Sequence, residues 1–117
     1  MFLSMLKGKI HGATVTEADV YYEGSIGIDQ SLLTLSGILP NERVSVWNRS
    51  NGKRFDTYAI VEPAGSGKIS VNGAAALLVS PGDTVIIAAF ALMTEEEAKN
   101  YQPNIVLISE KNSGTLK

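Results

Sequence analysis

Hydrophobic and polar positions alternate in short runs along most of the chain, and turn-forming residues separate the runs. This pattern predicts strands over residues 3–7, 9–16, 20–28, 43–48, 53–62, 68–71, 84–92 and 104–109. The run 84–92 is apolar throughout, which predicts a strand buried on both faces. So many short strands in 117 residues indicate a single mainly β domain, and we expect a small β-barrel.

Short helical segments interrupt these strands. Asp29 stands in N-cap position before leucines 32, 33 and 35, and Gly37 follows them, which predicts a helix over residues 29–36. A capping box at residues 94–97 predicts a second short helix that ends before Pro103. The alanines and leucines of residues 72–80 are typical of a helical turn.

Turn residues mark the connections between the predicted strands. Asn51-Gly52 lies between two β-rich runs and predicts a hairpin closed by a type I′ turn. Further turns are expected at residues 65–67 and 80–83, where glycine, serine and proline gather. We expect the last eight residues to be frayed.

Composition excludes several classes of function. The chain has no cysteine, which excludes disulfides, thiolate catalysis and zinc–sulfur sites. The net charge is −2 and no run of Lys or Arg occurs, so we expect neither nucleic acid nor membrane as a partner. The longest apolar run, 85–93, is too short to span a bilayer, and the N-terminus lacks a signal-peptide pattern. We expect a cytoplasmic protein.

Two familiar motifs are incomplete here, and a metal site lacks ligands. "GSGK" at 65–68 lacks the earlier glycine of a phosphate-binding loop, because Glu62 stands there, and a strand follows in place of a helix. "DTY" at 56–58 has tyrosine where aspartic proteases have glycine, and no second such segment supplies a partner carboxylate. His11 is the only histidine, so we expect no metal site.

The stretch "YYEGSIGID" (21–29) interrupts a predicted strand with Gly24-Ser25. One interpretation is a β-bulge or a close backbone crossing. A second is a serine hydrolase that uses Ser25 with His11, although no nucleophile elbow surrounds the serine. The third is self-cleavage, in which the serine hydroxyl attacks the carbonyl of Gly24 and the serine ends as a pyruvoyl group. Glycine permits the unusual backbone angles that this attack requires.

Five segments carry a resemblance to a known family over nearly the whole chain: "MLKGKIH" (5–11), "YYEGSIGID" (21–29), "VWNRSNGKRFDTYAI" (46–60), "ISVNGAAA" (69–76) and "GDTVIIAAF" (82–90). The chain resembles the bacterial aspartate 1-decarboxylases, pyruvoyl-dependent lyases that make β-alanine for pantothenate biosynthesis. The resemblance implies a six-stranded double-psi β-barrel with short capping helices, assembled as a homotetramer. It also implies self-cleavage into a β chain, residues 1–24, and an α chain, residues 25–117.

The resemblance further implies a role for individual residues. Ser25 becomes the covalent pyruvoyl group, which forms a Schiff base with L-aspartate and replaces pyridoxal phosphate or a metal, and Gly24 is the cleavage junction. Tyr58 is the proton donor and Thr57 serves both cleavage and substrate contact. The remaining substrate-binding positions are Lys9, Arg54, Asn72, Gly73, Ala74, Ala75, His11, Tyr22 and Trp47.

Some positions leave alternatives open. Thr57 faces away from Arg54 and Tyr58 on an ideal strand, unless a bulge shifts it. Gly12 stands where the family often has a basic residue, and Asp56 either pairs with Arg54 or faces solvent. The alternative to the enzyme is an unprocessed β-barrel that binds a partner without chemistry. A maturation protein is a possible further partner.

Overall fold

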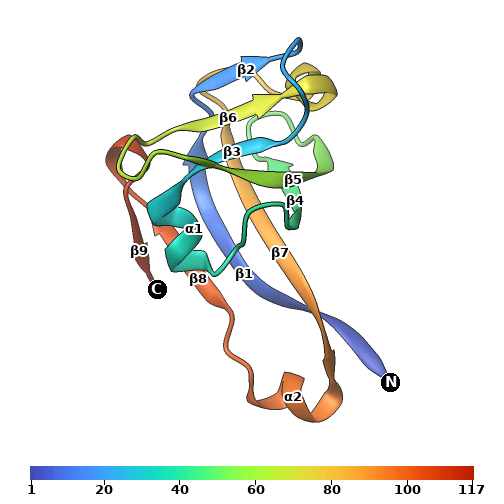
Figure 1. Cartoon of the computed structure of the whole chain (residues 1–117). Helices are drawn as coiled ribbons and strands as arrows, with labels where there is room; N and C mark the ends of the chain where they lie inside the picture. Colours follow the sequence, from blue (N-terminus) through green and yellow to red (C-terminus); the bar gives the residue numbers. More distant parts are fainter.

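The computed structural model describes all of residues 1–117 as one mixed β-sheet with short helices (Figure 1). The strands are β1 (Phe2–Thr14), β2 (Glu17–Asp19), β3 (Ile26–Asp29), β4 (Arg43–Asn48), β5 (Arg54–Glu62), β6 (Ile69–Asn72), β7 (Thr84–Thr94), β8 (Asn104–Ile108) and β9 (Gly114–Leu116). The helices are α1 (Gln30–Ser36), α2 (Glu95–Asn100) and the 3₁₀ segments η1 (Gly73–Leu78) and η2 (Glu110–Asn112). The protein is therefore mainly β, as predicted, with nine strands where six were expected.

The sheet runs in the order β2-β6-β3-β5-β4-β7-β1-β8-β9. The sheet is mixed: some neighbouring strands are parallel, such as β3 with β5, and others are antiparallel, such as β4 with β5. The inner face carries the core: Val46, Ile87 and Ile10 stand opposite one another on β4, β7 and β1, and all three are fully buried. Burial of such aliphatic side chains contributes roughly 1.5–3 kcal/mol each.

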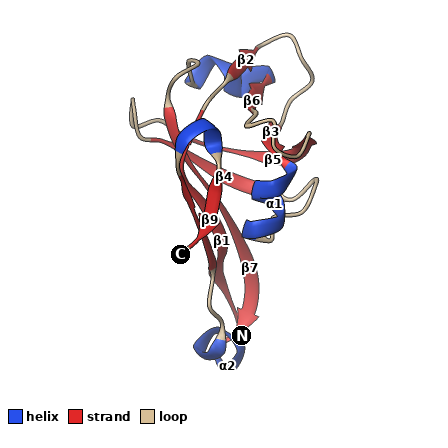
Figure 2. Cartoon of the chain, turned by 90° about the vertical axis from the view of Figure 1, so that its left-hand side faces the viewer, coloured by secondary structure: helices blue, strands red, loops and turns tan.

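The two longest strands extend beyond the body of the molecule as an arm. The first residues of β1 pair with the last residues of β7, and α2 lies at the tip near the N-terminus (Figures 1 and 2). On this arm Phe90 is 42% exposed and Leu92 is 72% exposed. The prediction that residues 84–92 are buried on both faces is therefore wrong for the outer half of β7, because no other strand covers it.

Two strand predictions at the N-terminal end are corrected. Residues 3–7 and 9–16 form one strand, β1, which changes register between Leu6 and Gly8 and again between His11 and Ala13. The strand predicted at 20–28 is reduced to β3, and residues 20–25 form a bend. The side chain of Asp19 accepts the backbone N–H of Tyr21 at 3.0 Å, which turns the chain at this point.

The local signals for helices are confirmed. The Asp29 side chain accepts the N–H of Ser31, and Gly37 ends α1 in the left-handed conformation at φ 76°. Thr94 and Glu97 form the predicted capping box of α2. The helical turn expected in 72–80 is η1. None of the helices is long and apolar enough to cross a membrane.

The hairpin of β4 and β5 is confirmed, but the turn type predicted for it is wrong. Gly52 has a positive φ of 79° whereas Asn51 does not, so a type I′ turn is absent. The Gly52 N–H instead donates to the carbonyl of Asn48 at 2.7 Å. The tail is not frayed, because β9 pairs with β8 and the side chain of Asn112 is hydrogen-bonded to the end of β1.

Candidate active site

Ser25 has the most unusual backbone among the predicted site residues. Its φ is +91°, in the region that favours glycine, and only 3% of the residue is exposed. Such a conformation costs roughly 1–3 kcal/mol and persists only where surrounding contacts hold it. One of these contacts is a hydrogen bond of 3.0 Å, in which the backbone N–H of Asn72 donates to the carbonyl of Ser25. Ser25 is thus buried and strained, and it follows the half-buried Gly24.

Residues from two other elements surround this junction. A Cβ atom placed on Gly24 would lie 3.7 Å from the hydroxyl oxygen of Tyr58 on β5. A Cβ atom placed on Gly73, the first residue of η1, would lie 2.9 Å from the Cα of Gly24 and 3.5 Å from the carbonyl oxygen of Tyr22. The structure therefore brings together six of the predicted site residues: Tyr22, Gly24, Ser25, Tyr58, Asn72 and Gly73. Ala74 and Ala75 follow Gly73 within η1.

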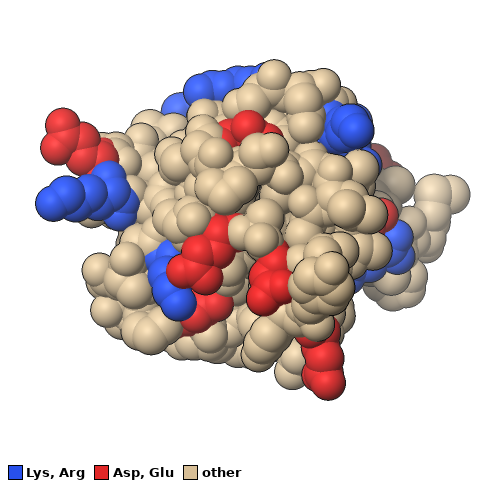
Figure 3. Space-filling model, turned by 90° about the horizontal axis from the view of Figure 1, so that it is seen from above, with Lys and Arg blue, Asp and Glu red and all other residues tan.

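A pocket of about 230 Å³ opens beside the junction and includes Tyr22 and Asn72 in its lining. Glu17, Glu62 and Lys68 also line it. Seen from the end of the molecule that carries β2 and β6, acidic and basic side chains are mixed, with uncharged surface between them (Figure 3). This end therefore has a pocket that is lined by charges of both signs.

A second group of predicted residues lies on the outer face of the sheet. Arg54 stands opposite Trp47, and its guanidinium carbon is 4.6 Å from the centre of the indole ring. Trp47 is level with Ile86 on β7, which is level with His11 on β1. Lys9 is two residues before His11 on the same strand and shares its face. The structure thus gathers Arg54, Trp47, His11 and Lys9 into one basic region.

The cations of this region are not paired with carboxylates. Neither Lys9 nor Arg54 takes part in an ion pair. Burial lowers the pKa of His11, and the nearby charges of Lys9, Arg49 and Lys117 lower it further. The Nδ1 atom of His11 is buried without a hydrogen-bond partner. Arg49, which the sequence analysis did not single out, lines a pocket together with Trp47 and Arg54 and so belongs to this region.

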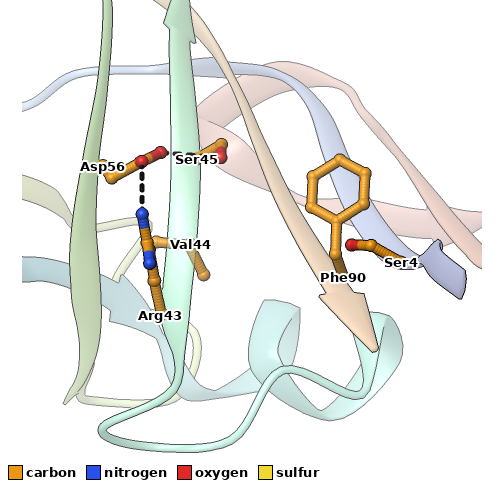
Figure 4. Close-up of a pocket in the computed structure, with 6 residues that line it drawn as sticks. All are labelled: Ser4, Arg43, Val44, Ser45, Asp56 and Phe90. Atoms are coloured by element: carbon orange, nitrogen blue, oxygen red, sulfur yellow. Dashed lines mark hydrogen bonds and ion pairs between the residues drawn. The ribbon is translucent and has the colours of Figure 1, made fainter. Parts of the chain in front are cut away.

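Asp56 pairs with Arg43 and not with Arg54. Its carboxylate accepts hydrogen bonds from the Arg43 guanidinium at 2.9 Å and from the Ser45 hydroxyl at 2.8 Å (Figure 4). These two bonds hold the pKa of Asp56 below its usual value. The three residues line a pocket of about 320 Å³ together with Ser4, Val44 and Phe90 (Figure 4). Arg54 therefore keeps its charge uncompensated.

Thr57 shows no bulge. The pairing of β4 with β5 runs without a register shift from Trp47–Arg54 to Arg43–Tyr58, so Thr57 faces away from Arg54 and Tyr58. No hydrogen bond joins its hydroxyl to Gly24. Gly12, the other departure, has a φ of +89° beside the second register shift of β1, a conformation that glycine adopts readily.

The two groups are separate within one chain. Arg54 and Tyr58 are four residues apart on β5, which corresponds to roughly 13 Å along a strand. Ser25 and His11 are not hydrogen-bonded, so the structure contains no Ser–His pair of the kind that the hydrolase alternative requires. One chain thus has two separate groups: the strained junction with Tyr58 beside it, and the unpaired basic region.

These features define the class: a mainly β protein with a strained Gly–Ser junction and a separate region of unpaired basic side chains. A sequence profile of the aspartate decarboxylase family matches residues 1–115. The chain is 62% identical to the aspartate 1-decarboxylase of Carboxydothermus hydrogenoformans over 112 residues. This alignment covers 96% of this chain and 88% of the relative. It is 59% identical to that of Caulobacter vibrioides and 57% to that of Hyphomonas neptunium, in each case over 96% of this chain and 95% of the relative. The chain belongs to the aspartate decarboxylase family.

Proposed function

We propose that this protein converts L-aspartate to β-alanine and CO₂, a reaction that feeds pantothenate biosynthesis. Membership of the aspartate decarboxylase family supports the reaction. The observation that carries the proposal is the positive φ of the buried Ser25, directly after Gly24. A strained Gly–Ser bond with a buried serine is the feature that self-cleavage needs and that a simple binding protein does not.

The catalytic group arises from the chain itself. The Ser25 hydroxyl oxygen bonds to the Gly24 carbonyl carbon while the C–N bond breaks, and the hydroxyl proton passes to the freed amine. Loss of the Ser25 Cα proton then breaks the Cβ–O bond and releases the Gly24 carboxylate. The dehydroalanine that remains takes up water and releases ammonia, which leaves a pyruvoyl group on residue 25. Chains 1–24 and 25–117 result.

The residues around the junction fit this group. Gly24 leaves the carbonyl sterically open, and Asn72 holds the Ser25 carbonyl through its backbone N–H. When formed, the pyruvoyl carbonyl supplies the electron sink for loss of the α-carboxylate. Tyr58, whose hydroxyl already lies beside Gly24, is placed to donate a proton to the product carbanion. Thr57 assists cleavage and contacts substrate in this proposal, although it makes no such hydrogen bond in the intact chain.

The basic region binds the substrate carboxylates. Arg54 offers a planar fork that is oriented by stacking on Trp47, and Lys9 offers a mobile point charge. His11 stays neutral between these cations and shapes the wall of the site. Tyr22 and the segment Gly73–Ala75 border the junction and contact the bound substrate.

We propose a homotetramer because the two groups are too far apart in one chain. The basic region of one copy then faces the junction of another, and the shared pocket excludes water from the carbanion. The curled sheet, with three parallel pairs among antiparallel ones, supports the double-psi β-barrel that the family resemblance implies.

Intact mass under denaturing conditions, before and after prolonged warming, tests the proposal. Two chains that divide after Gly24, the larger one lighter by one ammonia than a serine-terminated chain, are expected, together with β-alanine formed from L-aspartate. A single uncleaved mass that persists after addition of cell extract from the source would overturn it. Cleavage only with the extract would identify a maturation protein as a partner.

A further inference from the structure

The contact between η1 and the segment before Ser25 is closer than any side chain allows. A Cβ atom on Gly73 would lie 2.9 Å from the Cα of Gly24 and 3.1 Å from its amide nitrogen. Both of these are backbone atoms, which cannot rotate away as a flexible side chain does. Any residue other than glycine at position 73 must therefore displace Gly24 or move η1.

Neighbouring contacts fix the backbone on both sides of this point. At one end, Asp19 of β2 pairs with Asn72 of β6. At the other, the Asn72 N–H donates to the Ser25 carbonyl at 3.0 Å. Segment 20–25 is therefore attached to β6 at both of its ends, and Gly73 contacts the segment between these two attachments. A displacement at Gly24 cannot be relieved by sliding the whole segment.

We propose that Gly73 is a positioning residue for the self-cleavage step: its missing side chain lets the Gly24 backbone lie where the Ser25 hydroxyl can reach the Gly24 carbonyl. This inference rests on the proposed function and concerns maturation of the chain. It is separate from any contact of Gly73 with substrate. The strained φ of Ser25 is maintained by this close packing as well as by the hydrogen bond from Asn72.

The chain offers a matched control for the backbone cost of replacing a glycine. Gly73 and Gly52 have similar positive φ values, 67° and 79°, but a Cβ atom on Gly52 meets nothing within 4 Å. Gly73→Ala and Gly52→Ala therefore share the left-handed penalty, and only the first adds the collision with Gly24. Asparagine tolerates positive φ, so Gly73→Asn and Gly52→Asn form a second pair in which this penalty is reduced.

The experiment follows the fraction of cleaved chain over time by intact mass, with circular dichroism to verify the fold. We expect both Gly73 variants to cleave at least ~10-fold more slowly than the wild type, equivalent to ~1.4 kcal/mol in the barrier. Both Gly52 variants are expected to keep the wild-type rate. Folded Gly73 variants that cleave at the wild-type rate would overturn the proposal, and so would loss of fold in both of them.

A second readout does not depend on cleavage. In a Ser25→Ala background, which removes the nucleophile, we expect Gly73→Ala to expose segment 20–25 to limited proteolysis, whereas Gly52→Ala does not. Equal resistance in the two variants would contradict the positioning role. If the wild-type chain itself never cleaves, the proposed function fails, and the proteolysis result still decides whether Gly73 sets the position of the segment.

Discussion

Asp29 joins three parts of the chain through one carboxylate. Its Oδ1 atom accepts the backbone N–H groups of Ser31 and Gly65, and its Oδ2 atom accepts that of Gly67 at 2.9 Å. Burial by itself raises the pKa of Asp29, but the hydrogen bond from the Ser31 hydroxyl and those from the backbone N–H groups outweigh burial, and the pKa lies below its usual value. The ionised carboxylate therefore stabilises the start of α1 and the turn before β6 together.

Replacing this charge tests its contribution to stability. We expect Asp29→Asn to lower the free energy of unfolding at pH 7 by about 1–3 kcal/mol, because charged hydrogen bonds to backbone N–H groups are lost. A carboxyl whose folded pKa is lowered stabilises above its unfolded pKa, near 4, and loses that effect as the pH falls. Urea unfolding between pH 7 and pH 3 should thus show a flatter pH dependence for the variant than for the wild type.

The unfolding measurement needs a chain that stays intact, so both proteins carry Ser25→Ala. Glu110→Gln serves as the control, because Glu110 is exposed and takes part in no ion pair. An Asp29→Asn protein as stable as this control at pH 7 would show that the hydrogen bonds to Asp29 contribute nothing net.

Arg54 is the residue on which we expect substrate affinity to depend most. Arg54→Lys keeps the charge but removes the planar fork and the stacking on Trp47. We expect the KM for L-aspartate to rise by about tenfold, equivalent to about 1.4 kcal/mol, with a smaller effect on kcat. Steady-state kinetics of the processed enzyme measure this. The matched variant Arg43→Lys, at a guanidinium already paired with Asp56, should leave KM within about twofold.

At the scale of elements, the C-terminal segment is held by one buried side chain. The Asn112 amide accepts the N–H of Thr14 and donates to the carbonyls of Thr14 and Gly67, each at 2.8 Å. It therefore joins η2 to the end of β1 and to the turn that Asp29 also holds. This residue explains why the tail is ordered although its composition predicts a frayed end.

Truncating this side chain tests the attachment of the tail. We expect Asn112→Ala to lower the free energy of unfolding by about 2–3 kcal/mol, because it removes three hydrogen bonds to the backbone of Thr14 and Gly67. In this variant, exchange of the backbone amide hydrogens should be accelerated more in β9 than in β3. Asn100→Ala, at an exposed helix end, is the control and should change stability by less than about 0.5 kcal/mol. Unchanged exchange in β9 would show that strand pairing alone orders the tail.

The elements that sequence predicted correctly are those whose signals are local. The capping of α1 and α2 and the hairpin of β4 and β5 depend on residues a few positions apart, so their patterns are visible in the chain. The error at 20–28 has the opposite origin. The aromatic and β-branched residues there predict a strand. The Asp19 side chain turns the chain at Tyr21, but contacts of Gly24 and Ser25 with η1 and β6, some fifty residues away, hold the rest of the bend.

The site follows the same division. The motifs in the chain predict which residues belong to the site, whereas the arrangement of these residues in two separate groups depends on how β1, β4 and β5 align. The pairing of Asp56 with Arg43 is likewise set by this alignment. Arg43 lies across the hairpin from Asp56, and no local pattern in the sequence connects the two residues.

At the scale of the whole molecule, the projecting arm is the surface we expect to bind other copies. It is long relative to the body, since the molecule measures 42 × 26 × 24 Å, and its side chains Phe2, Phe90 and Leu92 are largely uncovered. Exposed apolar side chains on one projecting element indicate a protein–protein contact. This agrees with the proposed homotetramer.

A charge on this arm should weaken the assembly. We expect Leu92→Asp to shift the protein from tetramer toward smaller species in native mass spectrometry, because a carboxylate would be buried at the contact. Leu39→Asp is the control: Leu39 is 63% exposed but lies in the loop between α1 and β4, away from the arm. A Leu92→Asp protein that remains tetrameric would place the contact elsewhere.

The central position of β1 has a consequence for the mature protein. β1 lies between β7 and β8, and it belongs wholly to residues 1–24. After cleavage this strand would be a separate peptide, kept in the sheet by hydrogen bonds and packing alone. Unfolding of the sheet would then release two molecules from one, so the midpoint of unfolding would rise with protein concentration even without any dissociation of copies. The precursor folds as one chain, whereas the mature enzyme would have to reassemble from two.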